Sequence, residues 1–334
     1  MHSTSATSSK RLEIVELPHA AAANSFADDV RAGLTASPKH LSSKYFYDDL
    51  GSSLFDAITR LPEYYLTRAE TEILREWGWE IVRALDTTTE FLELGSGSAE
   101  KTRILIEEAL RVQDTLRYSP IDISRDALRA SSEALVSAFP RLTVRAYAGD
   151  YFAVLTSKVL RFERSVLAML MGSNIGNYQP KAAREFVALI GKALRPGDGL
   201  LLGTDLKKDG RVLEAAYDDP TGVTAAFDKN VLGRINRELG GEFDLRSFEH
   251  VARYDPARGV VDSFLRSTKA QHVRVAGLKL SVDFAKGETI HTESSYKFDE
   301  HDIAALAAAG KFEVAKTWHD RAKSFGVSLL LRKG

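Results

Sequence analysis

A strand that ends in a glycine-rich turn and leads into a helix is the feature that most limits how this chain can fold. Residues 89–103 read TEFLELGSGSAEKTR, an apolar strand followed by small residues and then by a helical pattern. Glycine permits positive φ and close approach of a ligand, and the N–H groups that open a helix favour electron-rich ligand atoms. We therefore expect Gly95, Ser96 and Gly97 to form a cofactor-binding turn.

The chain beyond this turn alternates short apolar runs with longer amphipathic ones. This pattern predicts strands at 90–94, 118–123, 143–148, 165–171 and 199–204, and helices at 101–112, 125–139 and 180–194. Strands with little polar alternation suit a sheet that is covered on both faces. The prediction is an α/β fold with a Rossmann-like doubly wound sheet.

The regular alternation ends near residue 208. Residues 211–240 predict a helix, a turn and a second helix, and strand-like stretches follow at 262–284, which indicates an inserted subdomain. Two more strand candidates, 291–298 and 324–334, flank a helix predicted at 300–309. We expect these two strands to close the edge of the large sheet, the second pairing with the first.

Composition excludes several classes of function. Lys and Arg number 45 against 46 Asp and Glu, so no broad attraction to nucleic acid or anionic membranes is expected. With no cysteine there is no disulfide, thiolate metal site or cysteine nucleophile. The apolar runs fall far short of the roughly 20 residues that span a bilayer, and no signal peptide is evident, so a cytoplasmic protein is predicted.

Histidines do not suggest a metal site. His250, His272 and His291 are scattered without metal-ligand spacing. We interpret them as structural or surface residues and expect no metal.

The spacing of small residues and acids narrows the choice of cofactor. A dinucleotide fingerprint would place a third glycine at position 100, where this chain has Glu100, so a nicotinamide cofactor is disfavoured. Asp122 ends the second predicted strand, where it can accept hydrogen bonds from ribose hydroxyls or be an ordinary solvated carboxylate. Asp150 follows the third strand, where it can receive an adenine amino group.

Long strings of the chain resemble one family. LELGSGSAEKT resembles the first motif of S-adenosylmethionine-dependent methyltransferases. MGSNIGNYQP, TESSYKF and KYFYDDLGSSLFDAITRLPEYYLTR, with similarity over nearly the whole chain, resemble the ergothioneine-pathway L-histidine N-alpha-methyltransferases. The resemblance implies trimethylation of the α-amine of free L-histidine to hercynine. Three molecules of S-adenosyl-L-methionine would be converted to S-adenosyl-L-homocysteine.

The same resemblance assigns site residues. It implies a cofactor site lined by Gly95, Ser96, Gly97, Lys101, Asp122, Asp150 and Tyr151. It implies that Asn177 and Tyr217 hold the α-amino and carboxylate end of the substrate, and that Gly172 and Ser173 shape the loop at the end of the fourth strand. An aromatic wall would come from Tyr64, Tyr47 and Phe55, and the imidazole would be bound by Glu293 and Ser295.

Three points stay open at this stage. The neighbouring Tyr65 competes with Tyr64 for the substrate contact, and the aromatic residues are also consistent with simple core packing. The family often has Met beside the imidazole where this chain has the smaller and polar Ser263, so the effect on substrate affinity and acceptor choice is left open. The proton of the amine has either water or a nearby tyrosine as acceptor, so no general base is assigned.

The expected organisation has two domains and an active site in the cleft between them. Residues 68–207 and 297–334 form the S-adenosylmethionine-binding methyltransferase domain. Residues 12–67 and 208–296 form an α+β substrate-binding lobe, and residues 1–11 a flexible tail. We expect a monomer that acts on free L-histidine, without nucleic-acid or membrane partners.

Two alternatives are kept. One is an N-methyltransferase of another free aromatic amino acid, and one is a non-catalytic S-adenosylmethionine-binding regulator. An RNA or protein methyltransferase is disfavoured by the neutral charge.

Overall fold

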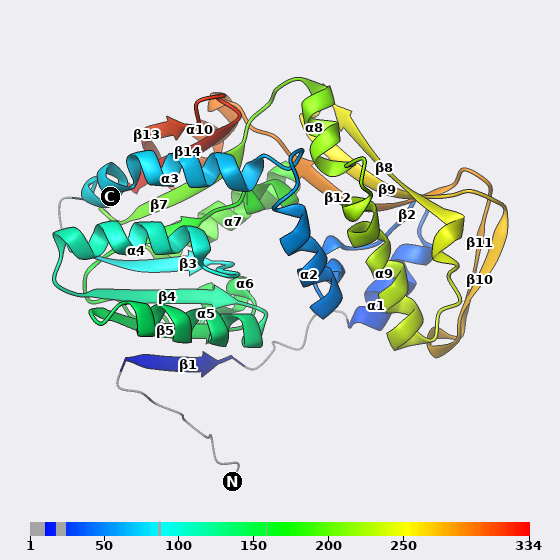
Figure 1. The fold of residues 1–334 in the computed structure, drawn as a ribbon, viewed down its shortest axis with the longest axis horizontal. Helices are drawn as coiled ribbons and strands as arrows, with labels where there is room; N and C mark the ends of the chain where they lie inside the picture. Colours follow the sequence, from blue (N-terminus) through cyan, green and yellow to red (C-terminus); the bar gives the residue numbers. More distant parts are fainter. Residues whose placement is uncertain (1–10, 18–24, 86–87, 158) are drawn as a thin grey trace, which may run out of the picture. The chain divides into compact units, whose positions relative to one another are not determined.

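The chain divides into two compact units in a computed structural model that describes residues 11–17, 25–85, 88–157 and 159–334 (Figure 1). The first unit comprises Met1–Ala20, Arg68–Leu206 and Phe298–Gly334, and the second comprises Ala21–Thr67 and Lys207–Lys297. Within the described ranges no helix is long and apolar enough to cross a membrane.

An eight-stranded sheet forms the centre of the first unit, in the order β1-β5-β4-β3-β6-β7-β14-β13. Figure 1 shows it running from β1 at the bottom to β13 at the top. Its strands are β1 (Leu12–Glu16), β3 (Thr89–Leu94), β4 (Leu116–Asp122), β5 (Leu142–Ala148), β6 (Ser165–Leu170), β7 (Gly199–Asp205), β13 (Phe312–His319) and β14 (Phe325–Arg332). Its helices are α3 (Leu66–Arg83), α4 (Glu100–Val112), α5 (Arg125–Ala138), α6 (Tyr151–Thr156), α7 (Pro180–Ala193) and α10 (Glu300–Ala309), with a 3₁₀ turn, η2, at Asn174–Asn177.

The parallel strands are buried on both faces, as their apolar sequences predict. All residues of β3 and β7 are buried. β3 pairs in parallel with β4 and β6, and only the β7–β14–β13 edge is antiparallel. The predicted α/β doubly wound fold is confirmed, and the five central strands lie within two residues of their predicted bounds.

The N-terminal strand corrects the expected boundary of the second lobe. Residues 12–16 form β1, which pairs in parallel with β5 through Leu12 and Val144 and so belongs to the large sheet. The reason is that a short apolar strand can complete an exposed sheet edge. The expected tail lies outside the described residues except for Arg11, whose guanidinium donates to the carbonyls of Val136 and Phe139 at 2.9 and 3.0 Å.

The predicted closure of the large sheet by residues 291–298 is wrong. That segment belongs to β12 (Thr289–Tyr296), which pairs with β9 in the second unit. The hairpin partner of β14 is β13, which the sequence analysis missed. β13 is an edge strand with half of its residues exposed, such as Glu313 and Lys316, so it lacks the apolar run that marks a buried strand.

A four-stranded sheet, β2-β12-β9-β8, and a separate hairpin, β10–β11, belong to the second unit. The strands are β2 (Lys39–His40), β8 (Phe248–Asp255), β9 (Val260–Ser267), β10 (Gln271–Val275), β11 (Leu280–Phe284) and β12. The helices are α1 (Phe26–Thr35), α2 (Asp49–Ile58), α8 (Gly210–Tyr217) and α9 (Val223–Leu239), with 3₁₀ turns at Ser43–Phe46, Leu245–Ser247 and Ala276–Leu278. The predicted helix, turn and helix at 211–240 are α8 and α9.

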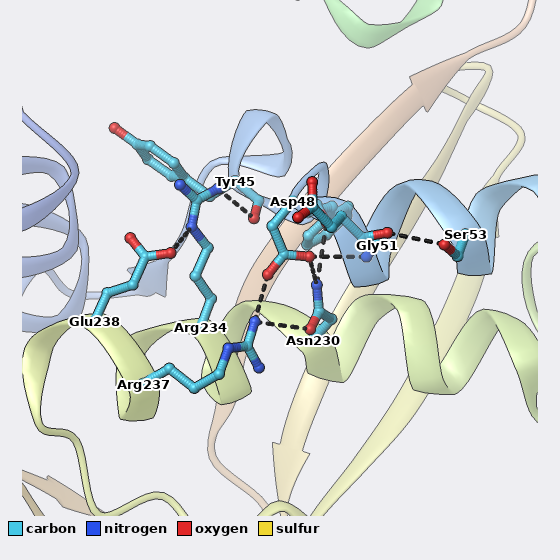
Figure 2. A network of polar contacts seen from close by, with 10 residues as sticks. Tyr45, Asp48, Gly51, Ser53, Asn230, Arg234, Arg237 and Glu238 are labelled. Atoms are coloured by element: carbon cyan, nitrogen blue, oxygen red, sulfur yellow. Dashed lines mark hydrogen bonds and ion pairs between the residues drawn. The ribbon is translucent and has the colours of Figure 1, made fainter. Parts of the chain in front are cut away.

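A polar network joins α2 to α9 (Figure 2). Asp48 caps α2 by accepting from the Gly51 N–H at 2.8 Å, and the same carboxylate accepts from the Asn230 amide of α9 at 2.7 Å and pairs with Arg237. Asn230 also donates to the Phe46 carbonyl at 3.2 Å. The network holds α2, which carries Phe55, against α9 within the second unit.

Candidate active site

The glycine turn after β3 adopts the backbone that its sequence predicts. Gly95 and Gly97 have φ of +79° and +49°, a region that side chains rarely enter, and a Cβ on Gly97 would meet nothing within 4 Å. Ser96 is buried, and its hydroxyl has no hydrogen-bond partner among the described residues. Open space beside Gly97 and an unsatisfied hydroxyl fit a polar ligand at this turn.

Two carboxylates stand at the ends of the neighbouring parallel strands. Asp122 ends β4 and accepts from the N–H groups of Gly97 and Ser124 at 2.8 and 2.9 Å. Asp150 follows β5 and caps α6 by accepting from Ala153 N–H at 3.1 Å. Because the carboxyl ends of parallel strands share one edge of the sheet, the glycine turn and both acids lie at that edge.

Tyr151 lies in an aromatic cluster beside Asp150. Its hydroxyl is 2.6 Å from that of Tyr178, and its ring stacks on Phe186 of α7 with centroids 5.1 Å apart. Burial raises the pKa of the Tyr151 hydroxyl. The ring is therefore a neutral, fixed apolar surface next to the strand-end acids.

Lys101 of α4 forms an ion pair with Glu70, a residue of α3 that the sequence analysis missed. The Glu70 side chain is fully buried and also accepts from Gly172 N–H at 2.9 and 3.0 Å. A Cβ on Gly203 would collide with this carboxylate. Glu70 thus joins α3, α4 and the loop after β6, although in the sequence it looks like any solvated helical acid.

The loop after β6 carries the predicted residues Gly172, Ser173 and Asn177. Gly172 and Ser173 have φ of +72° and +59°, and the Ser173 hydroxyl accepts from Asp205 N–H at 3.0 Å. The left-handed conformation is uncommon outside glycine, so the loop is held by its contacts. Asn177 ends η2, is exposed, and makes no hydrogen bond with the described residues, so its amide is available to a ligand.

The predicted aromatic residues of the second unit form a continuous cluster. Ring centroids are 5.6 Å apart for Tyr47 and Phe55, and 6.2 Å apart for Phe55 and Tyr64. Phe227 of α9, which was not predicted, lies 5.4 Å from Tyr47 and 5.9 Å from Phe55. Such a cluster can pack an apolar ring or hold a cationic group by cation–π attraction.

Tyr64 rather than Tyr65 belongs to this cluster. The Tyr64 ring lies 6.3 Å from that of Tyr217, whereas the hydroxyl of Tyr65 accepts from the Lys208 ammonium at 2.6 Å. The two adjacent side chains point to different surroundings, because the chain there lies between helices rather than in one.

Tyr217 and Ser295 are brought together, although 78 residues separate them in the chain. Their hydroxyl oxygens are 2.8 Å apart. Lys297, which the sequence analysis missed, donates to both oxygens at 2.8 and 2.9 Å. All three side chains are buried. Ser295 and Lys297 are two residues apart at the end of β12, a spacing that points two side chains to the same face of a strand.

Glu293 lies on the same face of β12 as Ser295 and is the cross-strand partner of Ser263. No described residue donates a hydrogen bond to the Glu293 carboxylate, which keeps some exposure. Burial, and secondarily the negative charge of Asp228, raise the pKa of Glu293 to about 7. A carboxylate that the protein leaves unsatisfied is suited to accept a hydrogen bond from a ligand.

The three histidines have different surroundings. His250 is buried between Asp228 and the carbonyl of Tyr217, His272 pairs with Asp283 in an exposed position, and His291 contacts Asp262 and Ser294. In the described part of the chain no group of three or more His, Asp or Glu is arranged to hold a metal ion.

Glu93, two residues before Gly95, points into the core instead of toward the turn. Its carboxylate accepts from the hydroxyls of Tyr118 and Thr102, the latter at 2.7 Å. Burial raises the pKa of Glu93 from 4.5 to about 7, against the opposing effect of these hydrogen bonds. Its role in this structure is to fix α4 and β4 behind the turn.

We predict that Glu93 makes the folded state less stable as pH rises. The pKa of Glu93 is higher in the folded state than in the unfolded state. Its contribution to the free energy of unfolding is therefore fully present below about pH 4.5 and is lost as pH rises to about 7. The free energy of unfolding of Glu93→Gln minus that of wild type should therefore be higher at pH 8 than at pH 5, by about 3 kcal/mol at most. Urea unfolding of both proteins at both pH values measures this change. The prediction is contradicted if the difference in stability between variant and wild type is the same at pH 5 and pH 8.

The fold and the strand-end residues define a class of protein. A doubly wound sheet with a glycine turn after one strand and acids after the next two is typical of α/β proteins that bind a nucleoside-containing cofactor.

Comparison with known proteins narrows this class to one family. Residues 26–332 match the profile of a family described as "Histidine-specific methyltransferase, SAM-dependent", and the chain belongs to this family. Histidine N-alpha-methyltransferase of Mycolicibacterium smegmatis is 46% identical over 93% of this chain and 96% of that protein. The protein of the same description from Mycobacterium tuberculosis is 46% identical over 90% of this chain and 93% of that protein.

A more distant relative is Ergothioneine biosynthesis protein 1 of Schizosaccharomyces pombe. It is 27% identical over 88% of this chain, which covers 39% of that protein. The predicted family resemblance is confirmed.

Proposed function

We propose that this protein is an S-adenosylmethionine-dependent methyltransferase that trimethylates the α-amine of free L-histidine to hercynine, the first step of ergothioneine biosynthesis. The family and the two relatives at 46% identity support histidine as the acceptor. The observation that carries the proposal in the structure is the face of β12. There, an unsatisfied Glu293 carboxylate lies two residues from Ser295, whose hydroxyl is hydrogen-bonded to that of Tyr217.

Glu293 and Ser295 would bind the imidazole. A charge-assisted hydrogen bond from a ring N–H to Glu293 discriminates against amino acids without that donor, because the carboxylate would then stay unpaired. Ser263, opposite Glu293, leaves a small polar neighbour where a larger thioether would fill space. Acceptor choice in this chain then depends on hydrogen bonds more than on apolar packing.

Tyr217 and the exposed amide of Asn177 would hold the amino and carboxylate end of histidine. The aromatic cluster would face the substrate nitrogen as it becomes cationic; its members are Tyr47, Phe55, Tyr64 and Phe227. Cation–π attraction would stabilise the cation by roughly 0.5–2 kcal/mol per good contact. Gly172 and Ser173 would shape the loop that carries Asn177.

The cofactor would be held in the first unit. The turn at Gly95, Ser96 and Gly97 would contact its amino acid portion, with Lys101 nearby. The ribose and adenine would be bound by Asp122, Asp150 and Tyr151. When bound, S-adenosylmethionine supplies an electrophilic methyl group, which leaves S-adenosylhomocysteine after each transfer.

Each transfer needs an amine with a free lone pair. The ammonium of histidine loses one proton before each of the three methylations, and the trimethylated product has none left to lose. In-line displacement requires little other acid–base work, so the residues of this chain act mainly by positioning. We propose no general base and no metal, so activity should persist after treatment with a chelator.

Mass spectrometry of a reaction with histidine and S-adenosylmethionine tests the proposal. The expected product carries three added methyl groups. A panel of free amino acids separates the histidine enzyme from one that methylates another aromatic amino acid. Calorimetry separates both from a regulator that binds the cofactor and has no histidine site. We further propose a cytoplasmic monomer, which light scattering and fractionation test.

A further inference from the structure

A buried histidine lies directly behind Tyr217. His250 of β8 has its Nδ1 2.6 Å from Oδ2 of Asp228 on α9, and its Nε2 2.7 Å from the carbonyl oxygen of Tyr217, the last residue of α8. The side chains of His250 and Asp228 are 1% and 3% exposed. The imidazole is therefore clamped between two groups of the protein and screened from water.

Both of those groups are hydrogen-bond acceptors. A backbone carbonyl only accepts, and so does an ionised carboxylate, whereas a neutral imidazole donates through one nitrogen only. A protonated His250 satisfies both acceptors. The neutral alternative satisfies them only if Asp228 itself carries the proton, buried as it is, and its Oδ1 has no partner among the described residues.

The charges around His250 favour its protonated form. Burial lowers the pKa of the imidazole, but Asp228, the Tyr217 carbonyl and Asp218 together raise it above the ordinary value. Three carboxylates from three elements interact electrostatically with the ring: Asp228 of α9, which also contacts it, Asp218 at the end of α8, and Glu293 of β12. The residue opposite His250 on β9 is Leu265, which is apolar.

We infer that protonated His250 is a positioning residue, which fixes Tyr217 by donating to its main-chain carbonyl while Asp228 anchors the other side of the ring. The inference rests on the proposed role of Tyr217 in binding histidine. The carbonyl belongs to the last residue of α8, where a carbonyl lies beyond the helix's own N–H donors, and His250 contacts it through Nε2. The phenol of Tyr217 is thereby held beside Ser295.

The positioning bond depends on pH. When His250 loses a proton, the charged Asp228 retains the Nδ1–H because a carboxylate is the stronger acceptor. The lone pair of Nε2 then faces the Tyr217 oxygen, and the bond is lost. The hydrogen bond between β8 and the Tyr217 carbonyl therefore weakens as pH rises through the pKa of His250.

Two variants test the hydrogen bonds of the two ring nitrogens of His250 separately. His250→Gln places an amide donor toward the Tyr217 carbonyl at every pH, whereas His250→Asn keeps a donor near Asp228 and removes the donor that His250 gives to the carbonyl. Calorimetry with L-histidine, in the presence of S-adenosylhomocysteine to prevent turnover, should show about tenfold or greater loss of affinity for His250→Asn. His250→Gln should bind nearly as wild type and lose the weakening at high pH.

A surface pair supplies the matched control. His272 and Asp283 form an equivalent contact of 2.7 Å with both side chains exposed, so His272→Gln should leave histidine affinity unchanged. Equal affinity of wild type and His250→Asn across the pH range overturns the inference, while the proposed function stands. If wild type does not bind histidine, the proposed function itself is contradicted.

Nuclear magnetic resonance of the wild-type protein tests the inference without a binding or activity measurement on a variant. In wild type, the ¹⁵N shifts of His250 should show both ring nitrogens protonated at pH 7, and the carbonyl ¹³C shift of Tyr217 should titrate with the same midpoint. A neutral ring at pH 7, or a Tyr217 carbonyl that does not follow His250, overturns the inference even if the variants fail to fold. Through-bond experiments on the wild-type protein assign both resonances.

Discussion

Glu293→Gln is expected to lower kcat/KM for histidine by about 10- to 100-fold. The glutamine amide keeps the size of the side chain but loses the charge, and a hydrogen bond to a charged group is worth about 1.5–3 kcal/mol. Its NH₂ group also presents a donor where the imidazole N–H needs an acceptor. Steady-state kinetics with histidine as the varied substrate measures the effect, which should appear mainly in KM.

The control for this variant is Glu249→Gln on β8 of the same sheet. Glu249 pairs with Arg266 at the surface, so the same chemical change should leave kcat/KM within twofold or so. Because the pKa of Glu293 is raised to about 7, removing its charge should not destabilise the fold at neutral pH. Unchanged kinetics in a folded Glu293→Gln would mean that the imidazole binds elsewhere.

Glu70→Ala is expected to lower the free energy of unfolding by about 3 kcal/mol. Breaking a buried ion pair by removing one partner typically costs about 3–5 kcal/mol, and the lower value applies because Lys101 keeps a quarter of its side chain exposed. The N–H of Gly172 also loses its acceptor. Urea unfolding at neutral pH measures the loss.

Two further variants identify the cause of that loss. Glu70→Gln keeps an oxygen for Gly172 N–H and removes only the charge, so it should be less destabilising than Glu70→Ala. Glu76→Ala, on the same helix, removes an exposed carboxylate 3.9 Å from Arg321 and should cost less than about 1 kcal/mol. If Glu70→Ala were as stable as Glu76→Ala, the buried pair would contribute nothing to the fold.

Cofactor affinity gives the Glu70 variants a second measurement. Without Glu70, the ammonium of Lys101 and the loop at Gly172 are no longer held together behind the glycine turn. We expect weaker binding of S-adenosylhomocysteine by calorimetry in Glu70→Ala, and a smaller change in Glu70→Gln. Unaltered cofactor affinity would restrict Glu70 to a role in stability.

Several parts of the candidate site follow from local sequence. The turn at Gly95 and Gly97 is recognisable because positive φ after an apolar strand requires glycine. Asp122 and Asp150 are recognisable because they follow the next two strands, and parallel strands end at one edge of the sheet. Long strings shared with a known family pointed to Tyr217, Glu293 and Ser295, which no local pattern marks as functional.

Other parts are invisible in the sequence because they are made by contacts between distant segments. Glu70 and Lys101 are 31 residues apart, and Tyr217 and Lys297 are 80 apart. Each of these residues looks like an ordinary charged or aromatic residue of its own helix or strand. Edge strand β13 was missed for a related reason, since its exposed residues carry no apolar periodicity.

The amino-acid sequence by itself determined the doubly wound sheet, the cofactor turn and the family, because these depend on short-range periodicity, on the backbone freedom of glycine and on strings of residues shared with a known family. Only the tertiary structure decided which side chains are buried together: Glu70 with Lys101, Tyr217 with Ser295 and Lys297, and His250 with Asp228. The physical reason is that burial and the partner of a charged or polar group set its protonation and its hydrogen bonds, and neither is a property of the local chain.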